Sequence, residues 1–129
     1  MGRSPNGGNR VRYVFTRPEP ATLKKLSHGE TLLLWRRREG MNQLTAAARL
    51  GVSPDAYRAW EADRRCWAGP PPKQRLGRLH PRELCVIARR RAGLKQWQVA
   101  EQVGCSRLWV VQMEDGAAPV DRLAKFWGV

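Results

Sequence analysis

The chain has 129 residues, of which 24 are Lys or Arg and 11 are Asp or Glu, so its formal net charge at pH 7 is +13. This length suits one compact domain or two very small ones and leaves no room for a large catalytic core. Such a charge predicts a polyanionic partner. Because the basic residues are spread along the whole chain, nucleic acid is favoured over a membrane surface. No apolar run approaches the roughly 20 residues of a membrane span, and residues 1–25 lack the apolar centre of a signal peptide, so we expect a cytoplasmic protein.

Residues that could carry catalysis or bind a metal are few. Cys66, Cys85 and Cys105 lie 19 and 20 residues apart, and neither histidine stands at zinc-ligand spacing from them. We therefore expect reduced thiols, no metal and no cofactor. The chain also lacks a phosphate-binding glycine loop and a nucleophile motif, so it is not predicted to be an enzyme.

A basic arm is predicted over residues 1–25. Its first ten residues are rich in Gly, Asn and Arg, which is typical either of a mobile arm that follows a DNA groove or of a segment without function. Residues 11–16 alternate, with Val11, Tyr13 and Phe15 on one side, which favours a short strand. Such a strand would need a mate, for example across a dimer.

Residues 26–66 predict a first unit of three short helices. Ser27 and Glu30 form the S-x-x-E pattern in which each side chain accepts a hydrogen bond from the other's backbone amide, so the first helix begins here. Gly40 ends it, a second helix ends at Gly51, and Ser53 is the expected N-cap of the third.

A proline-rich linker is predicted over residues 67–78, because three successive prolines at 70–72 forbid a helix. No further helix then follows the first unit to pack on its apolar face. Three partners could bury this face: the second unit, residues 21–26 or a second chain.

Residues 79–129 predict a second unit that begins with His80, Pro81 and Glu83. Its second helix covers about residues 95–103, and its third helix follows the N-cap Ser106. A further C-terminal helix is predicted over residues 120–127, with Leu123, Phe126 and Trp127 on its apolar face.

The two units are related by an internal repeat, because a shift of 53 residues aligns 26–63 with 79–116 without a gap. Eleven of these 38 positions are identical: Leu26/Leu79, Glu30/Glu83, Arg36/Arg89, Arg37/Arg90, Arg38/Arg91, Gly40/Gly93, Gln43/Gln96, Ala47/Ala100, Gly51/Gly104, Ser53/Ser106 and Glu61/Glu114. Each copy has the pattern of a helix-turn-helix, with a small residue (Ala47 or Ala100), a turn glycine four positions later and flanking apolar residues.

The stretch IARRRAGLKQWQVAEQVGCSRLWVVQMEDG, within residues 83–127, resembles the DNA-binding domain of the Cro and phage-repressor (XRE-like) family. The first copy, LLLWRRREGMNQLTAAARLGVSPDAYRAWEADRR, is similar but has Asp63 where the family's terminal glycine would fall. The resemblance implies an all-α fold with two tandem helix-turn-helix units. It also implies a fourth and a fifth helix, for which the first copy has no sequence.

In this fold the third helix enters the major groove of DNA. Arg58 is the strongest candidate for a guanine contact, while Asp55 either accepts from a cytosine amino group or complements the helix dipole. The resemblance implies that Gln43 and Gln96 lie against the DNA backbone. The complete set of predicted DNA-binding residues is Asn42, Gln43, Thr45, Ser53, Pro54, Asp55, Arg58, Lys95, Gln96, Ser106, Arg107 and Gln112.

Leu108, Trp109 and Val111 depart from the family pattern, which has mostly polar or small residues on this face. Two interpretations stay open: contact with thymine methyl groups, or burial against the first copy or a partner protein. One arginine of each triplet, 36–38 and 89–91, is predicted to meet a phosphate or to pair with Glu61 or Glu114. Core or inter-unit packing is predicted for Trp35, Trp60, Trp97 and Trp127.

The first hypothesis is a transcriptional regulator that binds double-stranded DNA, a repressor from a phage, plasmid or other mobile element, acting as a homodimer at the nucleoid. The alternative is a protein-interaction module with the same fold, an anti-activator or an inhibitor of a host-defence complex. Its support is the apolar third helix of the second copy.

Overall fold

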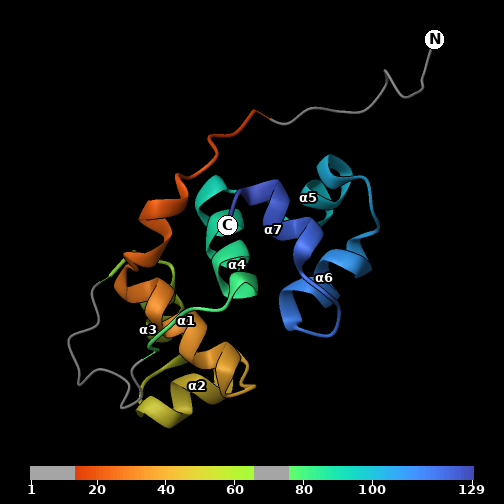
Figure 1. The fold of residues 1–129 in the computed structure, drawn as a ribbon. Helices are drawn as coiled ribbons and strands as arrows, with labels where there is room; N and C mark the ends of the chain where they lie inside the picture. Colours follow the sequence, from red (N-terminus) through yellow and green to blue (C-terminus); the bar gives the residue numbers. More distant parts are fainter. Residues whose placement is uncertain (1–13, 66–75) are drawn as a thin grey trace. The chain divides into compact units, whose positions relative to one another are not determined.

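The computed structural model describes residues 14–65 and 76–129, and among them every regular element is helical, as the sequence predicts (Figure 1). A 3-10 helix, η1, is followed by seven α-helices: η1 (Pro20–Lys24), α1 (His28–Arg38), α2 (Gln43–Leu50), α3 (Pro54–Glu61), α4 (Pro81–Ala92), α5 (Gln96–Val103), α6 (Arg107–Asp115) and α7 (Asp121–Trp127). Residues 1–13 and 66–75, which include most of the predicted arm, Cys66 and the three prolines, lie outside the described residues.

The predicted strand does not form in its described part, residues 14–16, which have no regular secondary structure. Phe15 instead packs against the rings of Phe126 and Trp127, with centroids 6.5 and 6.1 Å away. The guanidinium of Arg17 lies 4.5 Å from the centroid of Phe126 and donates to the backbone carbonyl of that residue. Aromatic and cation–π contacts with α7 therefore replace the strand partner that the alternation predicted.

Two compact units make up the chain. The continuous unit is Lys25–Leu79, and the split unit combines Met1–Lys24 with His80–Val129. Of the described residues before the first copy of the repeat, 14–24 thus belong with the second copy. The sequence had assigned residues 1–25 to a separate arm.

The core of the continuous unit lies between α1, α2 and α3. Its buried cluster is Leu32, Trp35, Met41, Ala46, Ala47 and Tyr57, with Leu50, Val52, Trp60 and Leu76 packed around it. Leu76 follows the proline segment, and the side chain of Arg38 donates to the backbone carbonyls of Leu76 and Arg78. Part of the predicted linker therefore covers the apolar face for which the sequence offered no helix.

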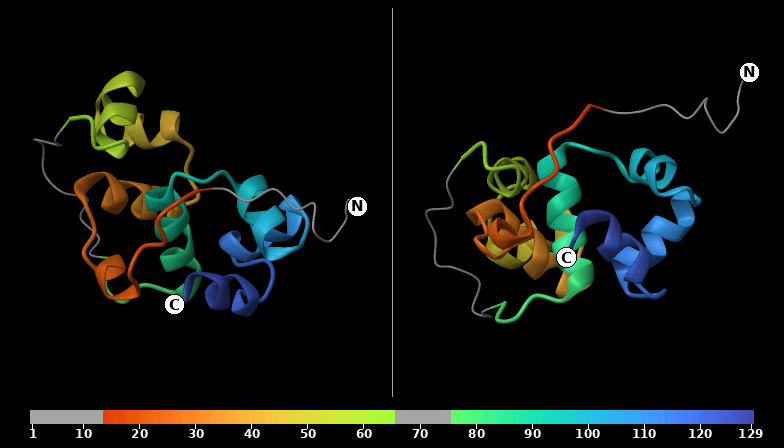
Figure 2. Two further views of the ribbon diagram at one scale, coloured as in Figure 1. Left: turned by 90° about the horizontal axis from the view of Figure 1, so that it is seen from above. Right: turned by 45° about the horizontal axis from the view of Figure 1, so that its top comes forward.

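In the split unit, α4 packs against α6, α7 and η1 (Figure 2). Leu23 of η1 is fully buried and η1 packs on α4, so residues 20–24 belong to the core of this unit, whereas the sequence offered residues 21–26 as one of three covers for the first copy. Leu123 and Trp127 of α7 are buried as well, which confirms the predicted C-terminal helix. The core of this unit therefore takes residues from both ends of the sequence.

Three of the four tryptophans predicted to pack do so. Trp35 and Trp127 are buried, and Trp60 is half-buried against the core of the continuous unit. Trp97 is 45% exposed, which corrects the prediction. It lies one helical turn before the exposed Glu101, on the side of α5 opposite the buried Val99.

Cys85 and Cys105 are free thiols. Burial, together with the negative charge of Glu114, raises the pKa of Cys85 to about 12. Within residues 14–65 and 76–129, no group of three or more His, Cys, Asp and Glu side chains could hold a metal ion. The helices described there are also too short or too polar to span a bilayer.

Candidate nucleic-acid interface

A charged cluster joins the three helices of the continuous unit. Arg36 of α1 forms a bidentate pair with Glu61 of α3, at 2.9 Å from Nε to Oε2 and 2.9 Å from Nη2 to Oε1. Gln43, the first residue of α2, donates from Nε2 to Oε1 of the same carboxylate at 3.0 Å. Arg36 also donates to the carbonyl of Met41 at 3.2 Å. Because Glu61 is 6% exposed, this cluster fixes the angles between the helices from within the fold.

The split unit holds the same contacts 53 residues later. Arg89 pairs with Glu114 at 2.8 Å (Nε to Oε2) and 3.1 Å (Nη2 to Oε1), and it donates to the carbonyl of Leu94 at 3.2 Å. Gln96 donates to Glu114 Oε1 at 2.9 Å. One arginine of each triplet therefore pairs with a glutamate, as predicted. Both glutamines hold that glutamate, a role that the sequence analysis did not assign to them.

The surroundings of Glu61 favour its charged form. Burial by itself raises the pKa of this carboxyl, but the hydrogen bonds from Arg36 and Gln43, together with the nearby Tyr57 hydroxyl, outweigh it, and the net pKa lies below the ordinary value. Burial is also the main reason that the pKa of Tyr57 is raised, and its hydroxyl donates to the carbonyl of Leu32. Val110 occupies the corresponding position in the split unit and has no hydroxyl.

The third helices of the two units begin in the same way, after the turn glycines Gly51 and Gly104, which have left-handed φ of 72° and 85°. Ser53 accepts from the backbone amide of Ala56 at 3.2 Å, and Ser106 accepts from that of Trp109 at 3.1 Å. Both serines are exposed. Capping therefore gives a backbone amide in the first turn of α3 and of α6 a hydrogen-bond partner, and it leaves these turns accessible to solvent.

On α3, the predicted base-reading residues lie at the exposed start of the helix. Pro54 is its first residue, and the side chain of Asp55 is 97% exposed. Arg58 is 45% exposed and donates from Nη1 to Asp55 Oδ1 at 2.9 Å. The Asp55 carboxylate thus orients the Arg58 guanidinium, in addition to the dipole role considered from the sequence.

The starts of α2 and α5 carry the remaining predicted backbone contacts. Asn42 is exposed and caps α2 by accepting from the amide of the exposed Thr45 at 2.8 Å. Lys95 is exposed, and its amide donates to Gln98 Oε1 at 2.8 Å, so its ammonium takes no part in the cap. Gln43 and Gln96 are half-buried, with their amide groups turned to the glutamates.

The exposed start of α6 is apolar. Arg107, its first residue, is exposed, and Leu108 and Trp109 follow it at 65% and 39% exposure. Val111 and Gln112 are half-buried. The structure therefore places the three apolar residues singled out from the sequence beside Arg107, on the part of α6 that corresponds to the predicted reading surface of α3.

Asp63 has a role that the sequence analysis missed. It has a left-handed φ of 59°, and its carboxylate accepts from the amide of Gly29 at 2.9 Å and from the hydroxyl of Ser27 at 2.6 Å. It thus caps the start of α1 from the end of α3. A side chain at Gly29 would meet the carbonyl oxygens of Glu61 and Trp60 at 2.4 and 2.7 Å.

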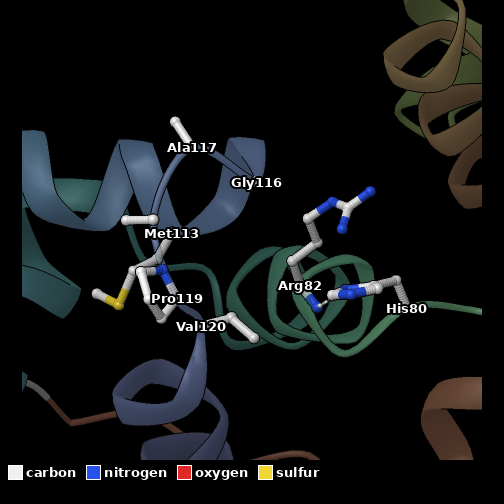
Figure 3. Close-up of a pocket in the computed structure, with 8 residues that line it drawn as sticks. His80, Arg82, Met113, Gly116, Ala117, Pro119 and Val120 are labelled. Carbon is white, nitrogen blue, oxygen red and sulfur yellow. Dashed lines mark hydrogen bonds between the residues drawn. The ribbon is translucent and has the colours of Figure 1, made fainter.

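In the split unit, the glycine and the larger residue of this contact have exchanged positions. Arg82 stands where the continuous unit has Gly29, and Gly116 stands in place of Asp63. A Cβ on Gly116 would lie 3.2 Å from Nε of Arg82. Figure 3 shows these residues around a pocket of about 450 Å³, with the Nδ1 atom of His80 accepting from the amide of Arg82 at 3.1 Å.

Arg122 of α7 supports the turn between α5 and α6. Its guanidinium donates to the carbonyls of Val103 and Gly104, each at 3.2 Å. These carbonyls end α5, where a cation is favourable. The C-terminal helix thus stabilises the start of α6 in the split unit.

Comparisons with protein-family models, with curated proteins and with solved structures gave no match. Function is therefore inferred from the residues and their geometry.

Proposed function

We propose that this protein binds double-stranded DNA in a sequence-specific way through two tandem helix-turn-helix units and regulates transcription. The observation that carries the proposal is the cluster of Arg36, Gln43 and Glu61 and its equivalent 53 residues later. Each cluster fixes three short helices so that the capped first turn of the third helix is exposed, which is the part of a helix-turn-helix that meets base edges.

Charge supports the same proposal in both units. The continuous unit contains 11 basic and 5 acidic residues, and the split unit contains 13 and 6. Each unit therefore attracts a polyanion, and neither depends on the other for this attraction. A repressor acts by occupying its operator, so this hypothesis requires DNA binding and no other activity.

The decisive experiment is a selection of duplexes from a random library, followed by fluorescence anisotropy with the selected duplex. Arg58→Ala and Arg107→Ala each remove one predicted base contact, and each should weaken binding by about 5- to 150-fold. Lys125→Ala is the matched control, because it removes one charge from an exposed site on α7. It should change affinity far less.

Failure to enrich any duplex, even at low salt, would contradict the proposal. So would equal losses for all three variants, because a purely electrostatic interaction responds to charge and not to position. Light scattering with and without the selected duplex tests the homodimer, and the spacing of protected half-sites in a footprint shows whether two or four units bind.

A further inference from the structure

Two positions on the third helix distinguish the two units. In α3 they carry Asp55 and Arg58, which form an exposed ion pair one turn apart. In α6 the shift of 53 residues places Leu108 and Val111 at the same positions. The same surface is thus polar in one unit and apolar in the other.

The apolar surface of α6 begins beside a positive charge. The exposed Arg107 is the first residue of the helix and directly precedes Leu108 and Trp109. The start of α6 also carries the positive end of the helix dipole. The two acidic residues of the helix, Glu114 and Asp115, lie at its other end, where Glu114 is buried against Arg89.

We propose that α6 recognises DNA through the 5-methyl groups of thymine, with Leu108 and Trp109 as the contacting side chains, while α3 recognises polar base edges through Arg58. This inference rests on the proposed function. It predicts an asymmetric binding site whose half under the split unit contains thymines at fixed positions. A major groove presents the thymine methyl as its one apolar group, so apolar residues there select for it.

The dimensions of the surface favour DNA over a protein as the occupant. A stable protein interface buries about 800 Å² on each partner, whereas Leu108 and Trp109 occupy a single helical turn. That turn also carries Arg107 and the positive end of the helix dipole, which suits a neighbouring phosphate. Leu108 is the more exposed of the two at 65%, so it is the first candidate for direct contact.

The test uses the full chain and the duplex selected above, with thymine replaced by uracil in one half-site at a time. Uracil keeps the base-pairing groups and lacks only the methyl group. Loss of each contacted methyl should weaken binding about 4-fold, from about 0.8 kcal/mol per buried carbon. Replacement in the half under α6 should have this effect, and replacement in the half under α3 should not.

Variants assign the effect to residues. Leu108→Ala and Trp109→Ala should each weaken binding to the thymine duplex and reduce the difference between thymine and uracil. Leu44→Ala, which trims another exposed apolar residue at 57% exposure, is the matched control and should retain it. Because all three side chains are exposed, circular dichroism should show unchanged folding.

The possible failures are distinguishable. If the chain binds its selected duplex tightly but tolerates uracil in both halves, this inference is overturned and the proposed function stands. If no duplex is bound, both are overturned. If Leu108→Ala leaves DNA binding unchanged and instead lowers the mass measured by light scattering, the surface joins two copies of the chain, and this inference is also overturned.

Discussion

The two units differ in the contact between the end of the third helix and the start of the first helix. The continuous unit has Gly29 on the first helix and Asp63 after the third, so the small residue admits the carboxylate that caps α1. The split unit has Arg82 and Gly116 at these positions, so the large residue lies over the glycine. This contact is therefore formed by a glycine and a larger residue in both units, with the glycine on opposite helices.

The buried charged clusters do not vary in this way. Arg36 with Glu61 and Arg89 with Glu114 have the same residue types and bond the same atoms. A buried carboxylate requires its cation, because neither charge is tolerated alone in a poorly solvated site. The helix geometry thus rests on the invariant pair, and the surroundings of each unit are free to differ.

The largest expected effect comes from breaking these pairs. Glu61→Ala and Glu114→Ala leave Arg36 or Arg89 without its carboxylate, at a cost of about 3–5 kcal/mol in the free energy of unfolding. Hydrogen exchange followed by mass spectrometry should show the loss of protection in the continuous unit for the first variant and in the split unit for the second.

Glu101→Ala serves as the control, because it removes an exposed carboxylate from α5 and should change stability by about 0.5 kcal/mol or less. Equal losses of protection in both units from either glutamate variant would contradict the view that each cluster acts within its own unit.

The next effect concerns the cover of each core. Leu23 is fully buried in the split unit, so Leu23→Ala should destabilise that unit by about 2–5 kcal/mol through lost burial and the resulting cavity. The continuous unit is covered in part by Leu76 and should keep its hydrogen-exchange protection. Loss of protection in the continuous unit alone would show that residues 20–24 cover the first copy after all.

A smaller effect follows from the exchanged contact. Gly29→Ala places a methyl group against two backbone carbonyls that cannot rotate away, and it should cost about 1–3 kcal/mol in chemical unfolding. Arg82→Ala at the equivalent position removes bulk from a half-buried site and should cost less. If the two variants were equally harmful, or Gly29→Ala harmless, the size relation between these positions would be wrong.

Sequence reasoning succeeded where a pattern is local. Capping residues such as Ser27 and Ser53, the turn glycines and the apolar spacing of each helix predicted the helices well, because these signals act within one or two turns. The pairing of an arginine with Glu61 was also predictable, since the repeat presents the same charges at the same separation twice.

Long-range contacts were beyond the same reasoning. Nothing near Phe15 or Arg17 indicates that they pack on α7, more than 100 residues later, instead of forming a strand. Asp63 was noted only as a departure from a glycine, because its capping of α1 depends on how closely α3 approaches Gly29. Trp97 was assigned to packing from its residue type, although its helix leaves it on the exposed side.

The smallest expected effect is the response to acid. It tests the Tyr57 hydroxyl near Glu61, for which the split unit has Val110 instead. The pKa of Glu61 is lowered in the folded protein, so its ionised form contributes stability that is present above the ordinary pKa of 4.5 and is lost as the pH falls through the lowered value. In denaturant unfolding, the stability difference between wild type and Glu61→Gln should be constant at neutral pH and shrink in acid. Tyr57→Phe removes a hydroxyl that lowers this pKa, so in its background the advantage of Glu61 over Gln should be smaller and should be lost completely at a higher pH. A wild-type advantage over Glu61→Gln that stayed constant into strong acid would show that the carboxylate charge contributes nothing.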